Sequence, residues 1–131
     1  AGGFAAGYAG GGPAVALELG ATLAAIGECW YMVAGAAEHT EETLLGLCAE
    51  RAAANGRDIL KESIKIFAGT GLVHTVEHAD ALKDLGKVMV NFEQDGSAGQ
   101  VVLTAAMTLH VQLLGEHHPW IRTIIRLMDG Y

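Results

Sequence analysis

Residues 14–37 form a run of 24 residues in which Glu18 and Glu28 carry the only charges. A run of this length could cross a membrane as one helix. An acid near the middle of an inserted helix costs about 2.5–3.5 kcal/mol, however, whereas each large aliphatic residue returns only about 0.3–0.6 kcal/mol. The sequence therefore predicts a helix that protein covers on most sides. A membrane span buried inside a larger complex stays open as an alternative.

Local signals predict that this helix runs from Pro13 to about Glu38, because proline suits the first position of a helix. Residues three and four apart share a helix face, so small residues at these spacings let a second helix approach closely. Trp30 is among the bulky residues beside this groove. We expect these residues to form packing or assembly contacts. The small residues of the groove are Ala16, Gly20, Ala24 and Gly27.

Caps, glycines and helical spacing divide the rest of the chain into shorter helices. Strand-like alternation is absent from the sequence. We predict an all-α fold, a compact bundle of four to six helices that forms a single domain over residues 13–131. The fifth helix carries no charged residue and is expected to be the central one. The predicted helices after the first are residues 41–55, 58–68, 72–93, 97–115 and 120–128.

Residues 1–12 form a glycine-rich arm that contains two aromatic residues, Phe4 and Tyr8. Glycine loses more backbone entropy on folding than any other residue, so such an arm needs external contacts to become ordered. We expect it to pack between subunits of an assembly, with the two aromatic side chains as anchors. An arm that folds back on its own domain is the alternative.

The string His74-Thr75-Val76-Glu77-His78 is the sharpest local pattern. It is similar to the inverted zinc-protease motif and resembles the His-Thr-Leu-Glu-His segment of the S-ribosylhomocysteine lyases. Both families need another ligand downstream, a glutamate in the first and a cysteine in the second. Here Cys29 and Cys48 precede the string, and the only later glutamates are Glu93 and Glu116. The likeness is confined to these five residues and implies neither family.

A metal site remains possible without that likeness. Two histidines at i and i+4 on one helix can share a metal ion. His74, His78 and His110 would converge if the fourth and fifth helices face each other in a bundle, and haem is a second option. The preferred interpretation is that the histidines are hydrogen-bonded at helix interfaces, in which case no cofactor is needed.

Charge excludes one class of function. The formal net charge is −7, and Arg122 and Arg126 form a basic pair at helical spacing. Coating of nucleic acid requires clustered basic side chains, so a nucleic-acid partner is not expected. No residue pattern predicts an enzyme.

Three classes of function therefore remain. The preferred one is a self-assembling structural subunit of a filament, pilus-like fibre, tube or shell, whose partners are copies of itself and which fits an extracellular or surface location. The second is a helical metal- or cofactor-binding protein that uses the three histidines. The third is a membrane-embedded subunit of a larger complex.

Overall fold

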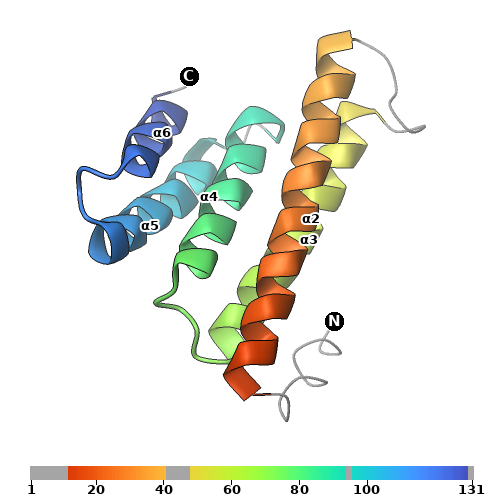
Figure 1. Cartoon of the computed structure of the whole chain (residues 1–131). Helices are drawn as coiled ribbons and strands as arrows, with labels where there is room; N and C mark the ends of the chain where they lie inside the picture. The colour runs from red at the N-terminus through yellow and green to blue at the C-terminus, as the bar shows by residue number, and fades with distance from the viewer. Residues whose placement is uncertain (1–11, 41–47, 94–95, 130–131) are drawn as a thin grey trace.

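The computed structural model describes residues 12–40, 48–93 and 96–129 (Figure 1). Within these ranges the secondary structure is helical throughout, which confirms the predicted all-α fold. The predicted arm, with Phe4 and Tyr8, lies outside the described residues apart from Gly12. The helices are α2 (Gly12–Thr40), α3 (Ala49–Gly69), α4 (Val76–Asn91), α5 (Gly96–Leu114) and α6 (Pro119–Met128).

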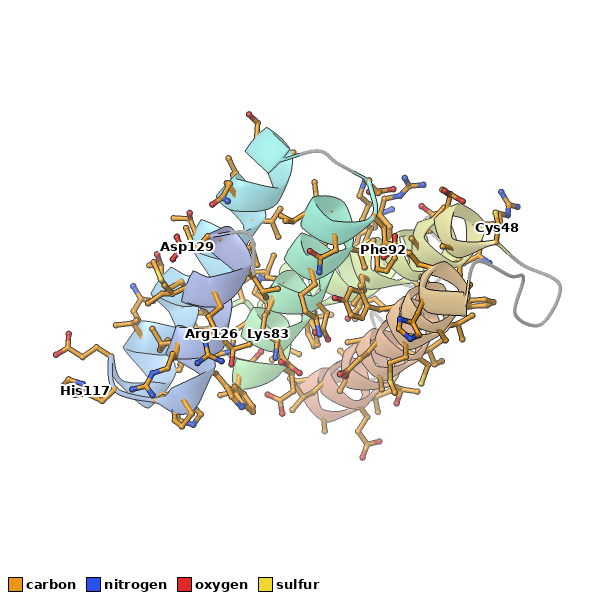
Figure 2. All side chains as sticks on the ribbon, turned by 90° about the horizontal axis from the view of Figure 1, so that it is seen from above. Cys48, Lys83, Phe92, His117, Arg126 and Asp129 are labelled. Carbon is orange, nitrogen blue, oxygen red and sulfur yellow. The ribbon has the colours of Figure 1, made fainter. Side chains whose placement is uncertain are left out.

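Helix α4 is the centre of the bundle and contacts each of the other four helices. Helices α2 and α3 form a long pair on one side of α4, and α5 and α6 lie on the other side (Figures 1 and 2). The prediction that the fifth helix is central is wrong, because α5 packs only on α4 and α6 among the described helices. Lack of charge did not indicate burial here, since much of the uncharged surface of α5 faces outward.

Helices α2 and α3 approach each other closely through glycines. A Cβ atom on Gly20 would lie 2.5 Å from Cε1 of Phe67, and one on Gly27 would lie 2.6 Å from Cγ of Leu60. Ser63 donates a hydrogen bond to the carbonyl oxygen of Gly20 over 2.6 Å. The groove of small residues that the sequence predicts is therefore filled by α3 of the same chain.

The predicted break at Asn55-Gly56 is wrong, because α3 continues through it without interruption. Gly56 is buried against α2, where an added Cβ would lie 3.0 Å from Cβ of Trp30 and 3.1 Å from the oxygen of Gly27. A glycine inside a helix costs about 1 kcal/mol relative to alanine. The close contact with α2 explains why a glycine lies at this position inside a helix.

Two other helix starts differ from the prediction. Helix α4 begins at Val76 rather than residue 72, and the side chain of Thr75 caps it by accepting a hydrogen bond from the backbone N–H of His78. Helix α3 begins at Ala49, after an extended Cys48, so it does not run continuously over the predicted residues 41–55; residues 41–47 themselves lie outside the described residues. The last helix agrees within one residue, with Pro119 in its first turn and the His118 side chain as its cap.

The buried side chains form two clusters on either side of α4. The larger lies between α2, α3 and α4, and includes Leu60, Phe67 and Val88. The smaller lies between α5 and α6, and includes Leu103 and Ile124. An ion pair between Arg57 and Glu93 ties α3 to the residues that follow α4.

Two glycines of α2 give a matched test of this packing. We expect Gly27→Ala to lower the free energy of unfolding by about 1–3 kcal/mol, because the added methyl group overpacks against Leu60. Gly35 has no atom within 4 Å of an added Cβ, so Gly35→Ala should instead raise it by up to about 1 kcal/mol through helix propensity. Urea unfolding measures both, and equal effects would contradict the close approach.

Candidate functional site

His74 and His78 do not lie on one helix as the sequence suggested. His74 is exposed and precedes the cap of α4, whereas His78 is buried in the first turn. The ring of His78 packs edge-on against Phe67 of α3, with 5.6 Å between ring centroids, and its Nδ1 has no hydrogen-bond partner. Burial lowers the pKa of His78, and the neighbouring His74 lowers it further. His78 is thus a neutral interface residue at pH 7.

His110 is buried between α5 and α6. Its Nδ1 lies 2.8 Å from the carbonyl oxygen of Ala106, and its ring packs edge-on against Trp120 at 5.6 Å. Nε2 is buried without a hydrogen-bond partner. Burial is the main cause that lowers the pKa of His110, opposed by the hydrogen bond to Ala106. The ring is therefore suited to packing in its neutral form.

The three predicted metal ligands do not come together. Within the described ranges, no group of three or more His, Cys, Asp or Glu side chains is arranged to hold a metal ion. His78 faces α3 and His110 faces α6, on opposite sides of the molecule's central helix. His110 agrees with the preferred interpretation, because it is buried at a helix interface and hydrogen-bonded. His78 is buried at an interface but its Nδ1 has no hydrogen bond, and His74 is exposed.

An acidic hollow of about 100 Å³ lies between α2 and α4. Alanines 21, 24 and 25 of α2 form one wall, so that small side chains leave the space open. Three acids on one face of α4 and one acid on α2 supply its polar lining. These acids are Glu28, Glu77, Asp80 and Asp84.

Asp84 is the buried member of this acidic hollow, with 2% of its surface exposed. Lys87 Nζ lies 3.2 Å from its Oδ1, but this oxygen has no hydrogen bond. Burial raises the pKa of Asp84 to about 6, although Lys87 acts in the opposite direction. Lys83 pairs with Asp80 in the same way, at 2.8 Å. The sequence placed these α4 residues on one face but did not show that Glu28 of α2 lies opposite them.

The outer face of α2 is solvent-exposed and largely apolar. Met32 is 66% exposed, and Val15 and Ile26 are exposed as well. Ile26, Cys29, Trp30 and Val33 line a shallow apolar groove of about 210 Å³ on this helix. The prediction that protein covers this helix on most sides is wrong for the described chain, because only α3 and α4 pack against it.

Helix α5 exposes a second uncharged face. Val101 is 70% exposed, and Val111 and Leu113 are exposed nearer the end of the helix. Residues 12–39 and 96–114 are long and apolar enough to cross a membrane by length and composition. Of the 18 most apolar consecutive residues, 22% are buried within the chain in the first segment and 28% in the second. Both faces are therefore left largely uncovered by the described part of the chain.

Comparisons with protein-family models, with curated proteins and with solved structures found no match.

Asp84 makes stability depend on pH in a defined direction. Its pKa is higher in the folded chain than its ordinary value of 3.8, so its contribution to stability is full below about pH 4 and is lost as the pH rises through 6. We expect Asp84→Asn to be more stable than the natural chain at pH 7.5, by on the order of 1–3 kcal/mol, and this difference to shrink toward pH 4. Urea unfolding across this range measures it.

Asp80→Asn is the matched control, because it makes the same chemical change at a carboxylate that is less buried and also paired with a lysine. A difference between Asp84→Asn and the natural chain that stays constant from pH 4 to 7.5 would contradict the raised pKa.

Proposed function

We propose that the chain is a self-assembling structural subunit of a filament, tube or shell, with copies of itself as partners. The observation that supports this most is a pair of exposed uncharged helix faces, one on α2 and one on α5, at opposite edges of the bundle (Figure 2). The α2 face is the more apolar of the two, since Thr104, Thr108 and Gln112 are exposed on α5. Contiguous apolar surface marks a docking site for protein or membrane.

The α2 face supports the proposal through its composition. Between Glu18 and Glu38 the exposed arc opposite α3 carries no charge, since Glu28 turns toward α4 and lines the acidic hollow. Large side chains such as Ile26 and Met32 supply the area that association needs. Burying one such side chain stabilises a contact by about 1.5–3 kcal/mol.

The position of the two faces supports an open assembly. A subunit with one self-complementary face forms a closed dimer, whereas a subunit with two separate faces can add a partner at each. If the faces bind each other, the contact repeats head to tail. If each binds its own kind, dimers still link into a longer array. Both arrangements give particles larger than a dimer, and a head-to-tail contact that does not close into a ring gives an open filament.

The arm belongs to this proposal as an assembly element. Ordering its residues costs about 1–2 kcal/mol each, and two aromatic side chains return about 2–3 kcal/mol each. Contacts with several surfaces must supply the difference, and a groove between subunits offers more of these than one convex domain. Phe4 and Tyr8 would be the anchors.

A charge placed on either face should prevent assembly. We expect Met32→Lys and Val101→Lys each to reduce the native particle mass, because a lysine would have to lose its hydration in the contact. Ala68→Lys adds the same charge at an exposed position of α3 and should leave the mass unchanged. Sedimentation velocity and negative-stain electron microscopy measure the outcome.

Two results would overturn the proposal in favour of a different function. A natural chain that stays monomeric at high concentration, and binds stoichiometric metal, would favour the metal-binding alternative. A chain that is dispersed only by detergent would favour the membrane-embedded alternative, which the two long apolar helices support.

The arm has its own test. Removal of residues 1–12 should leave the helical content unchanged and abolish or strongly weaken assembly. The double variant Phe4→Ser/Tyr8→Ser keeps the length of the arm and should have the same effect if the aromatic anchors matter. Circular dichroism and particle mass are the two measurements. Particles of normal size from the truncated chain would return the arm to a role within its own domain.

A further inference from the structure

We propose that the acidic hollow between α2 and α4 receives the exposed arginine pair of α6, Arg122 and Arg126, from a second copy of the chain. This inference rests on the proposed self-assembly and names one contact that would carry it. The acidic hollow lies between α2 and α4 and the arginine pair lies on α6, so each copy carries both halves.

The acidic hollow has more negative charge than its own lysines neutralise. Lys83 and Lys87 pair with Asp80 and Asp84, respectively. Glu28 and Glu77 form no ion pair with any described residue. Their side chains are exposed and half-buried, so they can reach a partner at the opening.

Asp84 gives a second indication that the acidic hollow can accept further hydrogen-bond donors, although Lys87 already forms an ion pair with it. It lines the acidic hollow, it is buried, and its Oδ1 lacks a hydrogen bond. A buried polar atom without a hydrogen bond is costly, and native proteins rarely retain one without a reason. Lys87, whose Nζ lies 3.2 Å from this oxygen, also lies 4.7 Å from the ring centroid of Tyr31. A cationic group entering the acidic hollow would supply hydrogen-bond donors close to this carboxylate.

The arginine pair lies on a regular helix and is exposed. Arg122 and Arg126 are four residues apart in α6, which places them on one face one turn apart. The opposite face of α6 is buried through Ile121, Ile124 and Leu127. Both arginines are exposed, and neither forms an ion pair with a described residue.

The chemistry of the two surfaces is complementary. Guanidinium groups bind carboxylates through paired hydrogen bonds, with fixed geometry. A volume of about 100 Å³ corresponds to about three waters, which is enough space for the planar head of one arginine. The alanine wall leaves this space without a side chain that would have to move. A bare metal ion fits less well, because no group of three or more ligating side chains among the described residues is arranged to hold one.

A charge-swap experiment tests the contact in the full-length chain. We expect Arg122→Glu/Arg126→Glu and Glu28→Lys/Glu77→Lys each to raise the concentration for half-assembly by roughly tenfold or more at physiological salt. An equimolar mixture of the two variants should regain assembly. The new glutamates on α6 of one variant can pair with the new lysines in the hollow of the other, and the unchanged arginines can pair with the unchanged acids. Light scattering and sedimentation velocity measure this, and circular dichroism shows that the variants are folded.

Arg51→Glu/Lys61→Glu is the matched control. It changes the net charge by the same amount as the α6 variant but at two exposed positions of α3, and it should leave assembly unchanged. Weakening by this control equal to that of the α6 variant would show an effect of net charge alone and would overturn the inference.

The remaining outcomes separate this inference from the function on which it rests. If the natural chain does not assemble, the proposed function fails first and this inference fails with it. If it assembles and neither charge reversal has an effect, only this inference fails. If only Glu28→Lys/Glu77→Lys loses assembly, and spermidine or Mg²⁺ alters the natural particle, the acidic hollow binds a small cation instead of the arginine pair. Loss in both variants without rescue in the mixture also contradicts the contact.

Discussion

The close approach of α2 and α3 is the constraint on which the rest of the structure depends. Gly20 and Gly27 allow side chains of α3 to reach the backbone of α2, and Gly56 does the reverse against Trp30. A methyl group at any of these positions would push the helices apart, since interiors are packed to the density of organic crystals. Helix α4 packs on the pair thus formed, and it in turn carries α5 and α6. The small residues of α2 face α3 and α4, and larger side chains such as Ile26 and Met32 lie on its outer, exposed face.

Helix α4 lies at the centre of the bundle although it carries several charged side chains. The contacts of its two lysines show how the bundle accommodates these charges. Lys83 Nζ is paired with Asp80 and lies 5.0 Å from the ring centroid of Trp120, which joins α4 to α6. Lys87 is paired with Asp84 and contacts the ring of Tyr31 on α2. A cation over an aromatic face contributes about 0.5–2 kcal/mol, more where water is excluded. The same residues that hold α4 between its neighbours also leave an acidic surface beside α2.

Much of the fold could be predicted from the sequence because local signals act on their own. Pro119, the capping residues and helical spacing fixed the start of α6 to within one residue, and the groove of small residues correctly indicated close helix packing. Properties that depend on a partner could not be predicted. Gly56 resembles a helix stop in sequence, and only its contact with Trp30 shows why it lies inside a helix. Thr75 caps α4 through a backbone contact, which removes His74 from the helix and separates the histidine pair. The acidic hollow requires Glu28 to face α4, which no spacing along one helix can show.

Assembly and internal packing compete for the same residues, and this determines where an interface can form. The sequence suggested that Gly20, Ala24 and Gly27 would pack between subunits, but these residues are buried against α3 and α4 of their own chain. An interface of the proposed assembly must therefore use the large side chains on the outer face of α2, the uncharged face of α5, and the charges on α4 and α6 that form no ion pair with a described residue. Apolar area supplies the free energy of such a contact but little direction, because it is not specific to one orientation. Charged pairs suppress wrong partners and fix the register of association. If the chain assembles as we propose, both kinds of surface act together and favour an ordered array over a non-specific aggregate.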